Sequence, residues 1–307
     1  MKNSLFKNIM LICIFGHGLH SMALNAAPYS NQTGQSPLIV AHRGGTADAP
    51  ENTAYAIDLA LRNHADVIWI SVQLSNDGVP VLYRPNNLNA LSNGQGLVSA
   101  YTVKQLQGLD AGWNVARNAG QQTIYPWRGK GIRIPTLQQV LTQFPRTTFY
   151  IDIKSPDADP VQIATAIKRV LVSTNSLNRV RLYSTERRYT DAVKQVGQIP
   201  YFVARDDTRD ILARVALNHN CQAAQEPIGW HGLELRRQVE VVETYTLGEG
   251  RSKAEFVWDK EIMNCFRTQA ANRIVLFGIN SEADYRIAKQ LGAEAVMVDS
   301  PAQFSNR

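Results

Sequence analysis

The sequence predicts a single (β/α)₈ barrel, in which eight parallel strands form a closed cylinder inside a ring of helices. Short apolar runs alternate with amphipathic helical patterns along most of the 307 residues, as is typical of parallel strands joined by helices. About eight runs of strand type can be counted, and a barrel commonly needs about 250 residues. No Gly-x-Gly-x-x-Gly segment follows the first strand, which weakens the alternative of an open nucleotide-binding sheet.

The first residues have the pattern of a secretory signal peptide, which we place at residues 1–26. A basic start precedes the apolar run 9–15, which is too short to span a bilayer, and small residues follow. The alternative is a frayed N-terminal helix of a cytosolic protein. Residues 27–36 are expected to be a polar linker and residues 37–307 the barrel domain. We therefore expect an exported protein, periplasmic or secreted, without a transmembrane segment in the mature chain.

The expected elements alternate in order along the chain. Residues 37–42 form an apolar strand and 53–63 a helix, and the strands 66–74 and 79–84 are joined by the turn sequence Ser-Asn-Asp-Gly. A long segment rich in Gly and Asn follows and is expected to cover one face of the barrel. One extra strand near 231–242 is counted outside the eight. Further strands are expected at 147–154, 179–184, 200–205, 273–279 and 294–298, and helices at 135–144, 159–172, 189–196, 209–217 and 281–291.

Charge and cysteine content limit the classes of partner. Removing residues 1–26 takes away two lysines and no acidic residue, so the formal net charge falls from +6 to +4. This mild excess fits anionic small molecules, and no arginine-rich tract or other motif indicates a nucleic-acid partner.

Cys221 and Cys265 remain after residues 1–26 are removed, and they could form one disulfide in an oxidising compartment or stay as two buried thiols.

Residues that can transfer protons or bind phosphate lie at the ends of several expected strands. The active sites of such barrels lie at the carboxyl ends of their strands. His42 and Arg43 end the first strand, Arg84 ends the third, and Asp152 and Lys154 end a middle strand. Histidine can transfer a proton, arginine can bind a phosphate through its bidentate fork, and lysine binds it as a point charge. These residues predict a phosphodiester site. The alternative for His42 alone is a hydrogen-bonded histidine without chemistry.

The segment AHRGGTADAPENTAYAI (41–57) resembles the opening motif of the glycerophosphodiester phosphodiesterases, which is His-Arg-Gly followed by Pro-Glu-Asn-Thr. The resemblance implies a TIM barrel of the phosphatidylinositol-phosphodiesterase type. It also implies metal-assisted hydrolysis of a glycerophosphodiester to an alcohol and glycerol phosphate, and the expected partner is a small-molecule glycerophosphodiester or a lipid headgroup. It continues in order through residues 73–83, 101–112, 133–141, 150–156 and 283–301.

The resemblance also implies roles for individual residues. His42 matches the first catalytic histidine, and Arg43 and Lys154 match the phosphate-binding cations. Asp152 stands where the family has a metal-binding glutamate and is the one candidate metal ligand. Glu51 belongs to the Pro-Glu-Asn-Thr element and is expected to support the loop.

The sequence departs from the family at the metal ligands. The family's Glu-x-Asp pair is replaced by Trp69 and Ser71, and its second His-Asp pair by Arg84 and Pro85. Because Ca²⁺ and Mg²⁺ prefer several anionic oxygen ligands, we expect no cofactor or a weakly bound divalent cation. Trp69 and Phe277, which stands near a family tryptophan, are expected to fill the metal position or to form an apolar substrate wall.

Three functions fit these residues. The first is a glycerophosphodiester phosphodiesterase of lipid metabolism that works without a metal, because Arg84 supplies the positive charge. Bacterial phosphatidylinositol-specific phospholipases C are similar, because they are barrels that use an arginine in place of a metal ion. The second is a catalytically inactive exported module, a pseudoenzyme, that binds phosphodiesters or other anionic ligands. In the third, a structural protein, Arg84 and Lys154 pair with Asp152 and Glu51. Hydrolysis is favoured because the His-Arg-Gly start and the Asp-x-Lys pair are retained.

Overall fold

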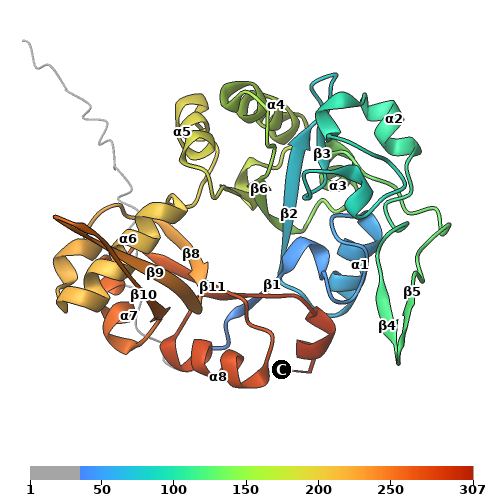
Figure 1. Cartoon of the computed structure of the whole chain (residues 1–307). Helices are drawn as coiled ribbons and strands as arrows, with labels where there is room; N and C mark the ends of the chain where they lie inside the picture. The colour runs from blue at the N-terminus through green and yellow to red at the C-terminus, as the bar shows by residue number, and fades with distance from the viewer. Residues whose placement is uncertain (1–34, 307) are drawn as a thin grey trace, which may run out of the picture. The chain divides into compact units, whose positions relative to one another are not determined.

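The structure is a computed structural model that describes residues 35–306, all of which lie in one compact unit (Figure 1). The expected signal peptide, residues 1–26, lies outside the described residues, as does most of the expected linker, residues 27–36. The described residues cover the expected barrel domain except its last residue. Within this part of the chain, no helix combines the length and the apolar character that crossing a membrane requires.

Parallel strands form a curled sheet at the centre of this unit, in the order β7-β6-β2-β1-β12-β11-β8. From β7 the ladder continues through Tyr201 and Phe202, whose parallel bridges with Leu182 and Trp230 connect β7 to β8. The ring of parallel strands is thereby complete, and the chain forms the predicted (β/α)₈ barrel. The strand bounds are β1 Leu38–Ala41, β2 Val67–Leu74, β6 Thr148–Ile153, β7 Val180–Tyr183, β8 Trp230–Glu234, β11 Arg273–Phe277 and β12 Ala295–Val298.

The structure corrects which runs of strand type build the barrel. β3 (Pro80–Leu82), counted among the eight, instead pairs antiparallel with β2 in the predicted hairpin and lies off the path of parallel strands. β8, in the region counted outside the eight, is a barrel strand that pairs with β11. The sequence pattern indicated the wrong strand because β3 is fully buried and is therefore as apolar as a barrel strand. β8 looked less like a barrel strand because it carries His231 and Gly232.

Helices pack on the outward-facing side chains of the strands. Ile39, Ile68 and Ile151 lie in the large apolar cluster that includes helix residues, and the Thr53 side chain caps α1 by accepting a hydrogen bond from the Ala56 amide. The α-helices are α1 Ala54–Arg62, α2 Val103–Gly108, α3 Leu137–Gln143, α4 Pro160–Ser173, α5 Arg187–Val196, α6 Arg205–Asn218, α7 Lys260–Arg267 and α8 Glu282–Leu291. The short 3₁₀ segments are η1 His42–Gly44, η2 Leu88–Ala90, η3 Val98–Ala100, η4 Leu177–Arg179, η5 Cys221–Ala224 and η6 Pro301–Phe304.

Aromatic rings fill the interior of the barrel. Trp69 on β2 is 2% exposed, and its ring centroid lies 4.9 Å from that of Tyr183 and 5.2 Å from that of Phe277. Tyr150 and Phe202 belong to the same cluster. Because side chains alternate between the two faces of a strand, the next inward-facing residue on each strand lies above this layer, where the strands end.

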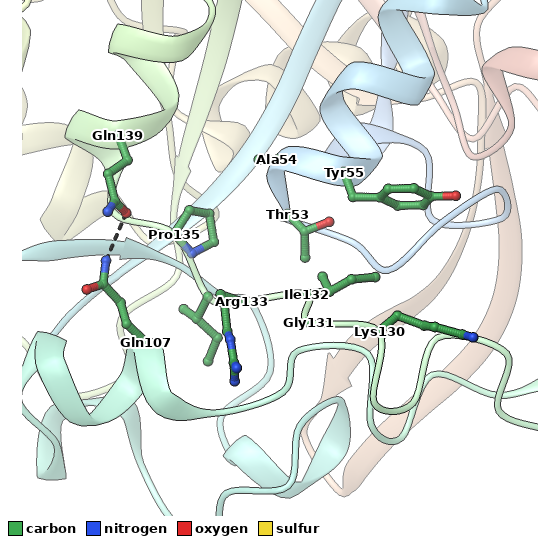
Figure 2. A pocket seen from close by; sticks show the side chains of 11 residues that line it. Thr53, Ala54, Tyr55, Gln107, Lys130, Gly131, Ile132, Arg133, Pro135 and Gln139 are labelled. Carbon is green, nitrogen blue, oxygen red and sulfur yellow. Dashed lines mark hydrogen bonds between the residues drawn. The ribbon is translucent and has the colours of Figure 1, made fainter.

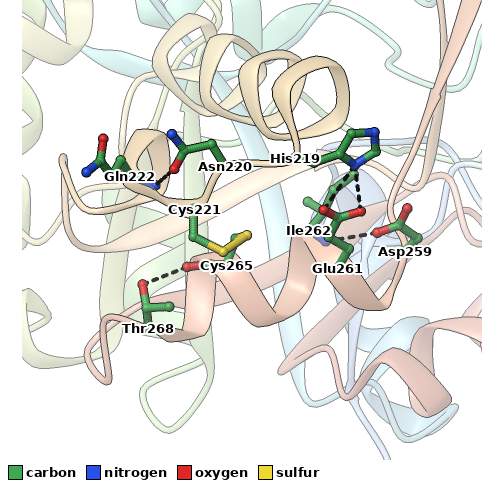
Figure 3. Close-up of a disulfide and its surroundings, with 9 residues drawn as sticks. All are labelled: His219, Asn220, Cys221, Gln222, Asp259, Glu261, Ile262, Cys265 and Thr268. Atoms are coloured by element: carbon green, nitrogen blue, oxygen red, sulfur yellow. Dashed lines mark hydrogen bonds and ion pairs between the residues drawn. A yellow bond between two sulfur atoms is a disulfide. The ribbon is translucent and has the colours of Figure 1, made fainter.

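Two insertions and one disulfide complete the unit. The segment after β3 contains α2 and the short hairpin of β4 (Arg117–Ala119) and β5 (Gln122–Ile124). After β8, the strands β9 (Arg236–Tyr245) and β10 (Gly248–Val257) pair antiparallel along their full length. Cys221–Cys265 is a disulfide that links η5 to α7 (Figure 3), so the pairing left open by the sequence is present.

Candidate active site at the carboxyl ends of the barrel strands

Polar side chains from neighbouring strands lie at one level above the aromatic layer, at the carboxyl ends of the strands, which we call the mouth. Parallel pairing places Ser71 opposite Asp152 and Asp152 opposite Tyr183. On the other side of the barrel, Phe277 lies opposite Glu234. The register therefore brings side chains that are far apart in sequence to the same end of the barrel.

His42 is oriented by a carboxylate that sequence reasoning missed. Its Nδ1 lies 2.6 Å from Oδ1 of Asp299, which follows β12, and Nε2 has no hydrogen-bond partner among residues 35–306. Thr46 and Asn280 also donate hydrogen bonds to Asp299, at 3.0 and 2.8 Å. The hydrogen bond from His42 lowers the pKa of the Asp299 carboxyl to about 2, although burial acts in the opposite direction. Asp299 is therefore an anion that fixes the imidazole ring.

The turn after β1 has a backbone that few sequences can adopt. Arg43, Gly44 and Gly45 have φ angles of 52°, 81° and 96°, in the region that favours glycine. A Cβ atom on Gly44 would lie 3.1 Å from the Cβ atom of Ala56, so α1 could not approach the turn as closely. The turn brings Nη1 of Arg43 to 2.7 Å from Oε2 of Glu51, so the two side chains form an ion pair.

Asp152 and Lys154 lie in the mouth beside further cations. Nζ of Lys154 lies 3.7 Å from Oδ2 of Asp152 and 2.5 Å from Oγ1 of Thr185. Burial raises the pKa of the Asp152 carboxyl to about 7, although Lys154, Arg43 and Arg84 each act to lower it. Arg84 is exposed and makes no ion pair or hydrogen bond with the rest of the described chain. Three cations thus surround one carboxyl group.

Several buried polar atoms of the mouth have no hydrogen-bond partner within the described chain. They are Ser71 Oγ, Asp152 Oδ1, Tyr183 OH, Asn52 Nδ2 and Glu51 Oε1. Leaving a buried polar group unsatisfied typically costs about 1–3 kcal/mol, so native proteins rarely do so without a reason. Their concentration at one end of the barrel indicates a site that is built to receive polar atoms of a ligand.

The donor set of the mouth does not fit a divalent cation. Among residues 35–306, no three His, Cys, Asp or Glu side chains lie close enough together to hold a metal ion. Glu51 is paired with Arg43, and the Lys154 ammonium lies beside Asp152. Ca²⁺ and Mg²⁺ need six or more oxygen ligands, several of them anionic, whereas here the oxygen atoms compete with fixed cations.

The two aromatic residues expected near the substrate are both buried in the barrel interior, Trp69 one inward-facing position before Ser71 and Phe277 in register with Glu234. Trp69 is surrounded by other rings and forms the floor of the mouth, where the family has a ligand carboxylate. Phe277 is also buried, and its ring passes so close to Gly232 that a Cβ atom there would lie 2.5 Å from the Phe277 Cζ atom. Both side chains fill the barrel interior and seal the base of the site.

A second charged group in the mouth was not predicted. Arg205, the first residue of α6, donates from Nη2 to both carboxylate oxygens of Glu234, at 2.5 and 2.8 Å. Arg237 approaches the same two oxygens at 3.3 Å. Glu234 ends β8, and because that run was not counted as a barrel strand, nothing indicated that its last residue faces the mouth.

The remaining histidines with described contacts take no part in the mouth. His231 is buried on the outer side of β8, where Nδ1 lies 3.0 Å from Oγ1 of Thr208, and burial lowers its pKa to about 4. His219 is exposed and pairs with Glu261 (Figure 3). His231 is therefore a packing residue, and His219 lies at the surface.

A separate pocket of about 510 Å³ lies outside the mouth (Figure 2). It lies between the start of α1 and the segment 130–135, and a hydrogen bond of 2.9 Å joins Gln107 to Gln139 at one side. None of the charged residues of the mouth lines it. Its lining comprises Thr53, Ala54, Tyr55, Gln107, Lys130, Gly131, Ile132, Arg133, Ile134, Pro135 and Gln139.

Comparison with known proteins places this geometry in a family. The chain is 41% identical over 267 residues to the uncharacterized protein Rv2277c of Mycobacterium tuberculosis, covering 86% of this chain and 87% of that protein. The crystal structure of the glycerophosphoryl diester phosphodiesterase domain of Rv2277c superposes with a TM-score of 0.81 at 39% identity, covering 88% of this chain and 98% of that domain.

More distant relatives carry the same family name. Glycerophosphodiester phosphodiesterase of Bacillus subtilis is 35% identical over 128 residues, 40% of this chain and 42% of that protein. A phosphodiesterase of Oleispira antarctica, solved with the product sn-glycerol-3-phosphate, has a TM-score of 0.63 at 20% identity, over 88% of this chain and 96% of that one, and shows the fold alone. The model of the glycerophosphoryl diester phosphodiesterase family matches residues 42–303, and the chain belongs to that family.

Proposed function

We propose that this protein hydrolyses a glycerophosphodiester to an alcohol and glycerol phosphate without a divalent cation. The observation that carries the proposal is the His42–Asp299 pair, at 2.6 Å, at the same end of the barrel as three cations. A histidine held by a carboxylate at Nδ1 has its Nε2 atom available for proton transfer. Family membership supports phosphodiester chemistry in general.

In the proposed reaction the cations take the place of the metal. Arg43, Arg84 and Lys154 bind the phosphodiester oxygens and stabilise the negative charge that develops in the transition state. A new P–O bond forms to the oxygen of an attacking water molecule as the P–O bond to the alcohol breaks. His42 accepts a proton from this water molecule and gives it to the departing alkoxide, which leaves as the alcohol. Asp299 stabilises the imidazolium form of His42 while it holds that proton.

A binding module remains the second candidate, because a specific observation favours it. Trp69 and Ser71 stand where the family has metal ligands, and among the described residues no second histidine lies in the mouth. Losing one acid or base typically costs 10² to 10⁴ in rate. The same cations and unpartnered polar atoms would then bind a phosphodiester or another anion without cleaving it.

Export is part of the proposal. The signal pattern of residues 1–26 supports it, and so does the Cys221–Cys265 disulfide, because structural disulfides persist mainly in oxidising compartments. Fractionation of cells that produce the full chain tests this, since a cytosolic protein that keeps residues 1–26 would contradict export.

The activity is tested with a panel of glycerophosphodiesters and a matched variant. The purified protein and its His42→Ala variant are incubated with glycerophosphocholine, glycerophosphoethanolamine, glycerophosphoserine and glycerophosphoglycerol, and the released glycerol phosphate is measured. We expect turnover that falls by at least about 10² in the variant. A folded protein that turns over none of these substrates, yet is stabilised by one of them, would favour the binding module.

A further inference from the structure

Arg205, Glu234 and Arg237 form a charged cluster that the reaction proposed above does not use. Two guanidinium groups share one carboxylate, so the cluster keeps one positive charge in excess. The Arg205 side chain is 13% exposed. Burial raises the pKa of the Glu234 carboxyl, but its backbone hydrogen bond and Arg205 hold that pKa below its ordinary value. Glu234 is therefore ionised and already occupied by both arginines.

The cluster carries hydrogen-bond donors that no atom of the described chain accepts from. Tyr183 is 5% exposed, and its buried hydroxyl group, which the Arg205 guanidinium approaches as a donor, has no acceptor for its own proton in the described chain. The charges that act on this hydroxyl are those of Arg205, Asp152 and Glu234, so it lies among them. Nε of Arg237 is also buried without a partner. Unmet donors beside an excess positive charge indicate an anionic acceptor from a ligand.

The cluster adjoins the phosphate-binding cations. Lys154 bonds to Thr185, which follows β7, and the next barrel segment, Tyr201–Phe202, leads directly to Arg205 at the start of α6. Arg205 is close enough for its charge to act on Lys154. A diester whose phosphate lies on Lys154 therefore has room to place one of its two substituents beside Arg205.

We propose that Arg205 and Tyr183 bind an oxyanion on the alcohol part of the substrate, so that the enzyme prefers diesters with an anionic headgroup. This inference rests on the proposed function. A cationic headgroup would meet two guanidinium groups, because Glu234 is already shared between them. An anionic headgroup would instead accept from Arg205 and the Tyr183 hydroxyl, and charge-assisted hydrogen bonds of this kind are the strong ones.

Glycerophosphoserine and glycerophosphoethanolamine test the proposal, because they differ by one carboxylate. We expect kcat/KM to be at least about tenfold higher for glycerophosphoserine. Arg205→Gln should bring this ratio to about one, and Tyr183→Phe, which keeps the ring in the core, should lower it about threefold. Arg236→Gln is the matched control, since Arg236 pairs with Asp284 on α8 and should leave the ratio as in the wild type. If the Arg205–Glu234 pair only joined α6 to β8, Arg205→Gln would lower the melting temperature and leave the ratio unchanged, which would overturn the proposal.

Binding of O-phosphoserine and O-phosphoethanolamine, measured by calorimetry, separates this proposal from hydrolysis itself. If the protein binds O-phosphoserine more tightly than O-phosphoethanolamine, loses this preference in Arg205→Gln and shows no turnover, the headgroup site is supported and the proposed hydrolysis is overturned. Turnover of both diesters with equal kcat/KM would overturn the headgroup site and leave the hydrolase. Absence of both turnover and preference would overturn both.

Discussion

Ser71 lies directly opposite Asp152 in the parallel register of β2 and β6, and neither Ser71 Oγ nor Asp152 Oδ1 has a hydrogen-bond partner in the described chain. The family places a carboxylate at the first of these positions. A hydroxyl group beside a buried carboxyl avoids the repulsion of two carboxylates, and Lys154, Arg43 and Arg84 lie close enough to lower the pKa of the one carboxyl that remains.

Ser71→Asp should recreate that repulsion. A second carboxylate against Asp152 is expected to lower the free energy of unfolding by about 1–3 kcal/mol in metal-free buffer. Added Ca²⁺ should return part of this loss in the variant and change the wild type little, because two adjacent carboxylates begin a hard-cation site. Thermal melts with Ca²⁺ and with EDTA measure both effects. Ser71→Asn is the uncharged control, and a calcium response of the same size in that control would contradict the interpretation.

Asp299→Asn should impair catalysis while the fold is kept. The amide can no longer stabilise the imidazolium form of His42 or fix its tautomer, and we expect kcat to fall by about 10² to 10⁴. Asn280→Ala removes a hydrogen bond to the same carboxylate and should have a smaller effect. Steady-state kinetics on the best substrate decide the matter, and wild-type kcat in Asp299→Asn would show that the pair is structural.

The stability of the protein should depend on pH through Asp152. The folded-state pKa is raised to about 7, above the ordinary value near 4. Between about pH 4 and pH 7 the folded protein therefore holds a proton that the unfolded chain has released, so stability falls as pH rises through this window. Asp152→Asn removes this dependence. Between about pH 4 and pH 8, the free energy of unfolding of the wild type should fall by up to about 4 kcal/mol relative to that of the variant.

Urea unfolding at several pH values tests this dependence. Asp58→Asn, at an exposed carboxyl that pairs with Arg62, is the control for a change of one aspartate outside the mouth. If the free energies of unfolding of the wild type and of Asp152→Asn differ by the same amount at every pH from about pH 5 to pH 8, Asp152 is ionised throughout, which would contradict this prediction.

The disulfide should stabilise the second half of the barrel. Cys221 and Cys265 are separated by 44 positions, and closing a loop of that size is expected to contribute about 2–4 kcal/mol. The double variant Cys221→Ser, Cys265→Ser, compared with the oxidised wild type, should show this loss in urea unfolding. Reduced wild type should match the double variant, and equal stability of reduced and oxidised protein would exclude the contribution.

Much of the fold and half of the site follow from sequence because they rest on local patterns. The order of apolar runs predicts the barrel, and the His-Arg-Gly turn and the Asp-x-Lys pair predict His42, Arg43 and Lys154 in the mouth. Asp299 was missed, although an aspartate directly after the apolar run 294–298 is a signal of the same kind. Arg205 and Glu234 could not be found, because their pairing depends on which run after residue 200 becomes a barrel strand.

The role of Trp69 shows the limit of such inference. Two-residue periodicity predicts that it shares a face with Ser71, and the structure agrees. The sequence does not show whether the ring fills the position of the family's metal ion or forms a substrate wall, because that depends on how far the neighbouring rings extend toward the carboxyl ends of the strands. Tyr150, Tyr183 and Phe277 surround it and leave it as the floor.

If fixed cations take the place of a metal ion in this protein, a chelator should leave hydrolysis unchanged, and measuring hydrolysis with and without chelator tests this most directly. The value of kcat/KM is measured with EDTA and with Ca²⁺ or Mg²⁺ for the wild type, for Arg84→Ala and for Arg62→Ala, which removes an exposed arginine far from the mouth. We expect kcat/KM to be equal in EDTA and in metal for the wild type and for Arg62→Ala, and to fall at least about tenfold in Arg84→Ala. Activity that EDTA abolishes and Ca²⁺ or Mg²⁺ restores would contradict it.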